Sequence, residues 1–401
     1  MPLKEIFKMR ILISNLEFPI FILFVLMSCF ECIEKVSQDS LGPQTGLFAR
    51  AQILHMALPP CTWHTCFNKS RCRKEDIAAG SIPVFIYDSK VDQKQGNLIM
   101  LPEGNLTRIT KNADEACVFL YRVQISRRGF MEHPDRYWHS DGENHILQVI
   151  EGSGDSTLVE WAKGPSHNDL LLDQAKLQSR LWRSLGRAMV FSNNWVRQEF
   201  RERFDVSVPL FRELKQGWPL ELASVQSQQK RFFLTFRGSI YSTRGRYRQT
   251  LLHLHNAEDR VSICGLCSGG RTCPTPPGVV HDCSRTYEEL FNSTFCLVPG
   301  GYHPATFRLR EAMSVGCIPV LVGDDYVKPF EDLIDWRNTA FEFCESCADD
   351  ILPALKATPP EVVEIMRKNT LKYYEEYLST RQAIWQTAFT VLLNRLKFRG
   401  L

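Results

Sequence analysis

The feature that most constrains the fold of this chain is an alternation of short apolar runs with longer amphipathic segments, which occurs twice. Short apolar runs bounded by turn residues are typical of buried parallel strands, and leucines at helical spacing are typical of crossover helices. The first series of runs occupies residues 82–88, 116–124, 145–150, 188–193 and 206–211, and the second occupies residues 232–238, 260–266, 294–300, 318–323 and 341–345. Segments 169–186, 286–292 and 305–316 are predicted to form helices between strands. The sequence therefore predicts an α/β fold of two doubly wound domains that face each other.

The length of the chain agrees with two domains, because 401 residues exceed what one hydrophobic core usually organises. A polar stretch separates the two series, so we assign residues 61–222 to an N-terminal domain and residues 223–357 to a C-terminal domain. Residues 358–401 are predicted to form C-terminal helices, since Pro359 and Pro360 stand where a helix would begin. The net charge of +3 argues neither for nor against an anionic partner.

The N-terminus has the pattern of a membrane-targeting segment. A basic flank precedes an apolar block at residues 11–30, and the full block is long enough to cross a bilayer. We predict a cytosolic tail and signal-anchor within residues 1–33, followed by a stem at residues 34–60. A cleaved signal peptide is the alternative, because the uninterrupted apolar core of the block is short.

Cysteine usage indicates an oxidising compartment. Fourteen cysteines are many for a cytosolic enzyme, and their clusters become disulfides in a lumen. A four-thiolate zinc site of Cys264, Cys267, Cys344 and Cys347 is the alternative, but these pairs lie much further apart than in compact zinc ribbons. We therefore predict disulfides and no metal site. N-glycosylation sequons, which agree with the secretory pathway, occur at Asn68, Asn105 and Asn292.

Residues 295–323, FCLVPGGYHPATFRLREAMSVGCIPVLVG, place Gly300 and Gly301 between a predicted strand and a predicted helix. Glycines let the backbone approach a phosphate, and a helix N-terminus offers free N–H groups to an anion. Arg308 adds donors for a diphosphate, and Glu311, one turn further along the same face, is placed to accept hydrogen bonds from a ribose. The segment therefore predicts a nucleotide-sugar site, with an ordinary surface helix carrying an ion pair as the alternative.

Four segments, in order along the chain, carry a resemblance to a known family. CTWHTCFNKSRC with IPVFIYD (61–88), FDVSVPLF (204–211), HNAED (255–259) and the motif from FCLVPGG to FEDLIDW (295–336) resemble the exostosin family, glycosyltransferase family 47. The first and third of these segments are similar to the branch that contains the heparan sulfate polymerases. The resemblance implies the GT-B arrangement of two facing Rossmann-like domains.

The resemblance also implies a function. It implies inverting, metal-independent transfer of a sugar from a UDP-sugar, without a further cofactor. In the heparan sulfate branch, the sugar is glucuronic acid from UDP-glucuronate, the acceptor is a glycosaminoglycan, and the enzyme is a single-pass type II membrane protein of the Golgi or endoplasmic reticulum. The second transferase module of that branch does not follow before residue 401, so a second exostosin-family subunit is expected to add N-acetylglucosamine. A non-catalytic scaffold or chaperone subunit and a transferase of another UDP-sugar are the alternatives, and no nucleic-acid partner is expected.

The sequence contains no Asp-x-Asp motif, so arginines and a helix dipole would have to stabilise the leaving UDP. Besides the two glycines, the predicted UDP-sugar-binding residues are Arg237, Arg248, Arg308 and Glu311. The candidates for the general base are Asp141, Glu143 and His145, although His145 could equally be a structural histidine. The disulfide candidates are Cys61 with Cys66, Cys296 with Cys317, and also Cys72 and Cys117.

Overall fold

The computed structural model of the chain describes residues 61–87, 106–122, 142–149, 186–240, 247–267, 282–301 and 304–398. The chain divides into two compact units, Met1–Ile53 and Leu54–Leu401, and all described residues belong to the second. The predicted signal-anchor, the helix predicted at 169–186 except Gly186, Asp141 and Asn105 lie outside the described residues. None of the described helices combines the length and the apolar composition that crossing a membrane requires.

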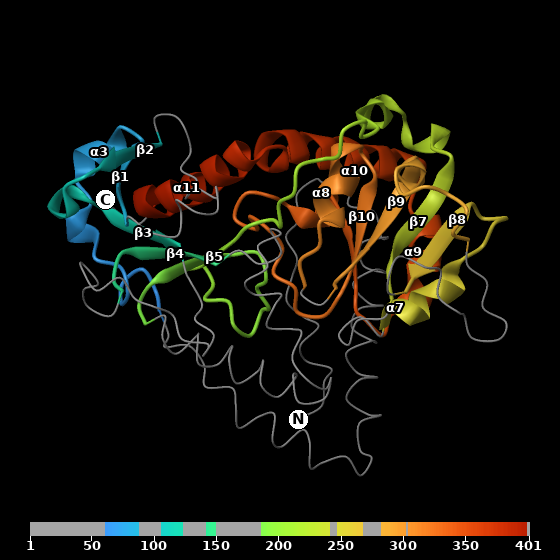
Figure 1. Cartoon of the computed structure of the whole chain (residues 1–401), viewed down its shortest axis with the longest axis horizontal. Helices are drawn as coiled ribbons and strands as arrows, with labels where there is room; N and C mark the ends of the chain where they lie inside the picture. The colour runs from blue at the N-terminus through green and yellow to red at the C-terminus, as the bar shows by residue number, and fades with distance from the viewer. Residues whose placement is uncertain are drawn as a thin grey trace, which may run out of the picture. The chain divides into compact units, whose positions relative to one another are not determined.

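The described residues form two sheets in which every paired strand is parallel to its neighbour (Figure 1). The six-stranded sheet has the order β2-β1-β3-β4-β5-β6, and the five-stranded sheet has the order β11-β10-β9-β7-β8. The strands are β1 (Ile82–Ile86), β2 (Thr107–Thr110), β3 (Val118–Arg122), β4 (His145–Val149), β5 (Met189–Ser192), β6 (Val206–Ser207), β7 (Phe232–Ser239), β8 (Val261–Leu266), β9 (Ser293–Pro299), β10 (Ile318–Val322) and β11 (Phe341–Phe343). Every predicted apolar run contains a strand, which confirms the predicted class of two Rossmann-like α/β halves. Only β2 was missed, because its sequence TRIT is mostly polar and partly exposed.

The helices follow the prediction less closely than the strands. The α-helices are α3 (Lys74–Ala78), α7 (Tyr247–Thr250), α8 (Arg308–Ser314), α9 (Ala348–Ala357), α10 (Pro360–Tyr373) and α11 (Arg381–Phe398). The other helical turns are η2 (Lys69–Arg71), η3 (Ala113–Glu115), η5 (Leu220–Ser224), η6 (Ser227–Gln229), η7 (Leu251–Leu254), η9 (Glu289–Phe291), η10 (Trp336–Asn338) and the π-helical η11 (Tyr374–Leu378). Of the helix predicted at 286–292, only the short 3-10 helix η9 forms. Pairing with β7 begins at the Asn292 carbonyl, so the last predicted residue already adjoins the start of β9.

The sequence Val315-Gly316-Cys317 explains why α8 ends where it does. Gly316 has a φ of 65°, in the left-handed region that glycine adopts without strain. Its N–H donates to the Met313 carbonyl, and the Cys317 N–H donates to the Ala312 carbonyl. These two bonds form a Schellman motif, which satisfies the last helical carbonyls and turns the chain into β10.

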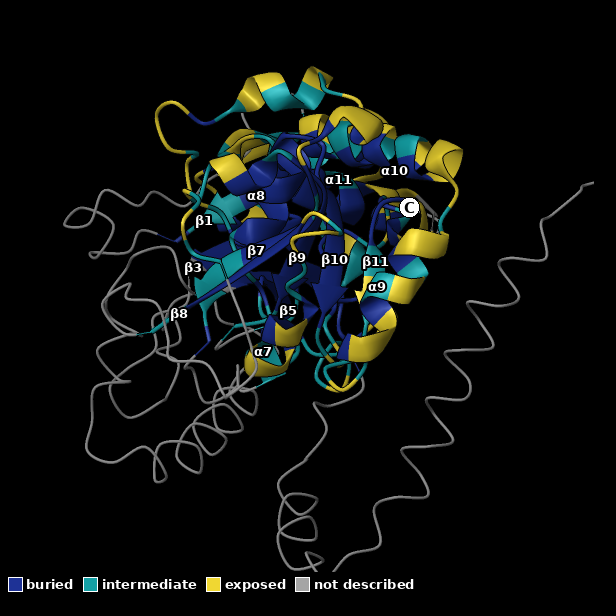
Figure 2. Ribbon diagram, turned by 90° about the vertical axis from the view of Figure 1, so that its right-hand side faces the viewer, coloured by how far each residue is buried: buried dark blue, intermediate teal, exposed yellow. Residues whose placement is uncertain are grey.

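The C-terminal helices are shared between the two sheets. Val363 and Met366 of α10 belong to the apolar core around the second sheet, whereas α11 packs on the first sheet (Figure 1). The Phe191 ring of β5 lies 6.4 Å from the Trp385 ring and 6.1 Å from the Phe389 ring of α11. In Figure 2 the central strands β9 and β10 are buried, while the outer faces of α9 and α10 are exposed. The last helix therefore completes the core of the N-terminal half.

All cysteines of the described residues are joined in disulfides. Five pairs lie wholly within these residues: Cys61–Cys66, Cys72–Cys117, Cys264–Cys283, Cys296–Cys317 and Cys344–Cys347. Cys264 is bonded to Cys283 and Cys344 to Cys347, so these cysteines are not the free thiolates that a four-thiolate zinc site would need. Within the described ranges, no group of three or more His, Cys, Asp and Glu side chains is placed to hold a metal ion. The disulfides indicate an oxidising compartment such as the secretory pathway.

Candidate functional site

The carboxyl ends of β9, β10 and β11 meet at one edge of the second sheet. The pairing register sets Val322 of β10 beside both Pro299 of β9 and Phe343 of β11. The Gly300 N–H donates to the Val322 carbonyl at 3.0 Å, which holds this glycine at the strand ends. In open α/β sheets, ligands bind outside this edge.

A cavity of about 740 Å³ lies at this edge. Its wall includes Gly300, Gly301, Thr306 and Leu309 from the segment between β9 and α8. Its other lining residues are Val196, Arg197, Gln198, Glu199, Tyr247, Val298, Pro304, Leu321, Val322, Gly323, Asp324, Asp325, Tyr326, Lys328, Glu342, Phe343 and Glu345. This volume is within the range of small-ligand sites.

Both halves of the chain contribute to the cavity wall. The segment after β5 reaches the segment after β10 through an antiparallel bridge between Val196 and Tyr326. The Arg197 N–H donates to the Asp325 carbonyl at 2.7 Å, and the Val327 N–H donates to the Trp195 carbonyl at 3.1 Å. The cavity is therefore formed where the two halves are joined by backbone hydrogen bonds.

The two basic side chains of the cavity wall are both paired with carboxylates. Arg197 donates to both carboxylate oxygens of Glu331 at 2.9 Å. Lys328 lies 2.7 Å from a Glu342 oxygen and 3.4 Å from a Glu331 oxygen. Acidic lining residues outnumber the basic ones, and the Gly300 and Gly323 N–H groups already donate to the Val322 and Phe343 carbonyls.

Gly300 and Gly301 line the cavity, whereas Arg248 does not and instead contacts the end of β9. The Arg248 guanidinium donates to the carbonyls of Ser239 at 2.8 Å, Pro299 at 2.8 Å and Gly300 at 2.7 Å. Burial lowers the pKa of this guanidinium. Through these bonds Arg248 connects the end of β7 to the end of β9 and holds the backbone of the glycine turn in place.

Arg308 and Glu311 do not line the cavity either. Glu311 is two positions beyond Leu309, which is about 200° around a helix, so the two side chains leave α8 on opposite faces. The Glu311 carboxylate accepts a hydrogen bond from Arg212 Nη2 at 2.7 Å and another from the Tyr287 hydroxyl. The Arg308 guanidinium donates to the Arg237 carbonyl and lies 4.8 Å from the centre of the Tyr287 ring.

Arg237 is similarly engaged, since its Nη1 donates to the carbonyls of Cys283 at 3.0 Å and Arg285 at 2.7 Å. Tyr287, which contacts both Arg308 and Glu311, has its pKa raised to about 12 by burial, and it is therefore a neutral donor at physiological pH. The structure thus brings Arg237, Arg308 and Glu311 together in one network beside the cavity, rather than on its wall.

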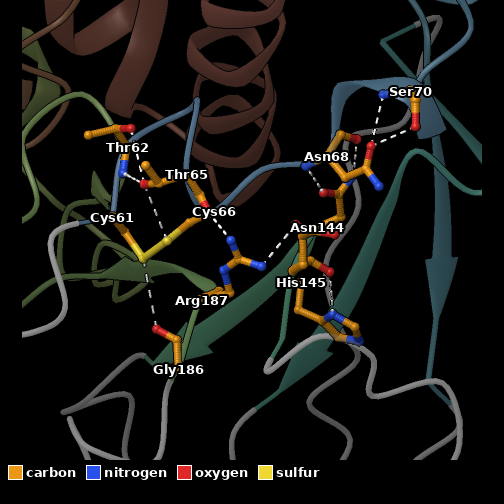
Figure 3. A network of polar contacts seen from close by, with 11 residues as sticks. Cys61, Thr62, Thr65, Cys66, Asn68, Ser70, Asn144, His145, Gly186 and Arg187 are labelled. Atoms are coloured by element: carbon orange, nitrogen blue, oxygen red, sulfur yellow. Dashed lines mark hydrogen bonds and ion pairs between the residues drawn. A yellow bond between two sulfur atoms is a disulfide. The ribbon is translucent and has the colours of Figure 1, made fainter.

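The described base candidates, Glu143 and His145, lie at or just before the start of β4 in the first sheet, and Figure 3 shows His145 among its polar neighbours. The His145 ring is fully buried and stacks on Phe119 at 4.8 Å, with Nε2 2.7 Å from the Tyr87 hydroxyl and Nδ1 2.9 Å from the Glu143 carbonyl. The Glu143 carboxylate lies 3.3 Å from Arg187. These contacts favour the structural interpretation of His145.

The carboxylates of the cavity wall were not predicted. Asp324 and Asp325 come just after β10, separated from it by Gly323, whereas Glu199 comes seven residues after β5. A search for polar residues just beyond each predicted strand could have found Asp324 and Asp325, because that position faces the ligand edge of a parallel sheet.

Two parallel α/β sheets with a glycine-edged cavity at their strand ends are typical of proteins that bind nucleotides. Residues 93–345 match the Exostosin GT47 domain, which is more than half of the chain. The chain therefore belongs to the exostosin GT47 family of glycosyltransferases, as the quoted motifs predict.

Individual relatives are distant. Exostosin-1 of Drosophila melanogaster is 27% identical over an alignment of 373 residues that covers 84% of this chain and 45% of that protein. Exostosin-1 homolog of Caenorhabditis elegans is 26% identical over an alignment of 378 residues that covers 84% of this chain and 90% of that protein. The chain thus spans about half the length of the Drosophila relative. Among solved structures, WaaG, a glycosyltransferase involved in lipopolysaccharide biosynthesis, is 11% identical with a TM-score of 0.33, and the match covers 79% of this chain and 99% of that chain.

Proposed function

We propose that the chain transfers a sugar from a UDP-sugar to a glycan with inversion, and that the donor occupies the cavity at the ends of β9 and β10. The observation that supports this most is the placement of Gly300 and Gly301 on the cavity wall, directly before the segment that enters α8. A diphosphate there can approach the backbone closely because no Cβ atoms intervene. Arg248 would support the donor site indirectly, because its hydrogen bond to the Gly300 carbonyl holds the glycine turn in place.

The reaction requires one proton acceptor. The acceptor hydroxyl oxygen attacks the anomeric carbon, the bond from that carbon to the UDP oxygen breaks, and UDP leaves with the electron pair while a base takes the hydroxyl proton. Asp141, Glu143 and His145 remain candidates from the sequence. Glu199 joins them, because it lines the cavity and comes from the N-terminal half.

For the donor, we propose glucuronic acid from UDP-glucuronate in heparan sulfate elongation, on the basis of the resemblance to the polymerase branch. The enzyme would be metal-independent and anchored as a type II protein in the Golgi or endoplasmic reticulum membrane, with a second exostosin-family subunit adding N-acetylglucosamine. Another UDP-sugar is the alternative donor, and the carboxylates of Asp324, Asp325 and Glu345 on the cavity wall favour an uncharged sugar.

One observation favours a non-catalytic subunit instead. Arg237, Arg248 and Arg308, the described arginines of the predicted site, all donate to backbone carbonyls. A scaffold that retains the fold would need these bonds and no nucleotide.

The test uses the full chain, alone and co-expressed with a second exostosin-family protein. UDP release is measured with UDP-glucuronate, UDP-xylose and UDP-galactose, each with and without a chelator, on an acceptor that ends in N-acetylglucosamine. We expect transfer in the presence of chelator, and a large loss in Glu199→Gln. Glu202→Gln is the matched control, because that side chain is 70% exposed and makes only a 3.6 Å contact with Arg197. Failure to bind UDP, together with no transfer from any donor in the complex, would support the scaffold.

A further inference from the structure

The disulfide Cys344–Cys347 differs from the four disulfides Cys61–Cys66, Cys72–Cys117, Cys264–Cys283 and Cys296–Cys317. It closes a shorter loop than they do, with a sequence separation of 3 against 5, 45, 19 and 21. Both of its cysteines are partly exposed, whereas each of these four pairs has at least one cysteine that is no more than 5% exposed. Exposed disulfides are more often the labile or regulatory ones.

Of the five disulfides compared, chain entropy predicts the smallest stabilising effect for Cys344–Cys347. A cross-link stabilises the folded state mainly by restricting the unfolded chain, and the restriction grows with the length of the closed loop. A loop of this length restricts the unfolded chain little, so the disulfide adds little to the free energy of unfolding.

The backbone around the pair suits thiol–disulfide exchange. Cys344 directly follows β11, and Cys347 is the N-cap of α9, a helix of ten residues. The Cys347 N–H donates to the Cys344 carbonyl at 3.1 Å, which keeps the two residues in one turn. The N-terminus of a helix favours a thiolate over a thiol, so Cys347 is the better leaving group. Of the acidic residues in the first turn of α9, Asp349 is paired with His253 at 2.8 Å.

We propose that Cys344–Cys347 is a thiol–disulfide exchange site that regulates the cavity. The reductant is a small thiol of the glutathione class or the dithiol of an oxidoreductase. Its thiolate attacks Cys344 Sγ, the Cys344–Cys347 bond breaks, and Cys347 leaves as a thiolate that then takes up a proton. A second thiol attacks the mixed disulfide and releases Cys344, so two electrons pass to the chain and the reductant becomes a disulfide.

Hydrogen bonds of the residues next to the two cysteines connect the exchange site to the cavity. Glu345 lines the cavity, and its N–H donates to Asp324 Oδ1 at 3.1 Å. Phe343, just before the pair, also lines the cavity, and its carbonyl accepts from the Gly323 N–H at 3.1 Å. Reduction removes the cross-link that holds this turn, so the wall formed by residues 323–325 and 343–345 loosens.

The first experiment measures which disulfide opens first in the folded full chain. The protein is equilibrated in glutathione buffers of increasing reducing strength, free thiols are trapped by alkylation, and the cysteines are identified by mass spectrometry. We expect Cys344 and Cys347 to be labelled at a thiol concentration roughly tenfold lower than any other pair. Cys61–Cys66 is the internal control, since it also closes a short loop but both of its sulfurs belong to buried residues. Simultaneous labelling of all pairs, or labelling of Cys344 and Cys347 last, would overturn the proposal.

The second experiment tests the link to the cavity without relying on transfer. Hydrogen exchange is compared for the oxidised chain, the selectively reduced chain and the Cys344→Ser/Cys347→Ser variant. We expect faster exchange at residues 323–325 and 343–347 in the last two, with the core of β9 unchanged, and the Cys61→Ser/Cys66→Ser variant should leave the cavity segments as they are. Unchanged exchange at 323–325 after selective reduction would refute the regulatory part, whether or not the cavity binds UDP.

Discussion

The two faces of α8 differ in how their polar groups are used. The face that carries Leu309 looks onto a cavity edged by Gly300 and Gly301. Arg308 and Glu311 lie outside that face, are both 5% exposed and already hold protein partners. One face has room for a ligand, and the other is filled by the chain itself.

This difference shows that a charged pair on a short helix can serve the site without lining it. Arg310 of the same helix donates to the carbonyls of Arg212, Leu378 and Ser379 at 2.7–2.9 Å, and so it anchors α8 to the C-terminal helices. Buried cations that satisfy carbonyls fix a helix in place, and a fixed helix holds the adjoining glycine turn in one geometry. The predictions below separate this supporting role from direct ligand binding.

The largest effect is expected for Arg248→Ala. Three carbonyls lose a charged donor, so the free energy of unfolding should fall by about 3–5 kcal/mol, as measured by urea unfolding. Arg231→Ala is the control, since that exposed side chain only stacks on the Phe232 ring at 5.2 Å. Lost UDP affinity with unchanged stability would mean that Arg248 contacts the nucleotide directly.

A smaller effect is expected from the pH dependence of Lys230, which donates to the Leu222 carbonyl and to the carbonyl of Val315 at the end of α8. Burial lowers the pKa of Lys230 to about 8. Between about pH 8 and the ordinary pKa of 10.5, the folded chain has released a proton that the unfolded chain still holds, so the free energy of unfolding rises with pH, by up to about 3 kcal/mol.

The measurement for Lys230 is the urea unfolding midpoint at about pH 7.5 and at about pH 10. Lys230→Met should remove most of the rise, because methionine keeps the apolar stem without the titrating group. An equal rise in the variant would show that other groups cause it.

The smallest change in stability is expected on the cavity face. A Cβ at Gly300 would lie 3.2 Å from the Tyr247 hydroxyl, whereas a Cβ at Gly323, also on the cavity wall, meets nothing within 4 Å. That contact would push on the Tyr247 hydroxyl, which donates to the Gly300 carbonyl, and so would shift the glycine turn. Gly300→Ala should therefore weaken UDP binding about tenfold, which corresponds to about 1.4 kcal/mol, and change the free energy of unfolding by less. Calorimetric titration with UDP makes the measurement. Equal affinities for Gly300→Ala and Gly323→Ala would place the nucleotide elsewhere.

The sequence by itself determined the strands, the glycine turn after β9 and the family. Each of these depends on local patterns: apolar runs of strand length, glycines where a strand gives way to a helix, and ordered motifs. The end of α8 could be predicted for the same reason, because the turn after it requires a left-handed backbone and the sequence places Gly316 there.

Only the tertiary structure decided which side chains reach the cavity. Arg308 and Glu311 share a face of α8, as their spacing requires, but packing against Arg212 and Tyr287 turned that face away from the cavity. Glu199 and Asp325, which come from different halves of the chain, line the same wall because the segments after β5 and β10 are hydrogen bonded. Periodicity fixes the angle between two residues on a helix, whereas the direction of the whole helix depends on contacts between residues far apart in the sequence.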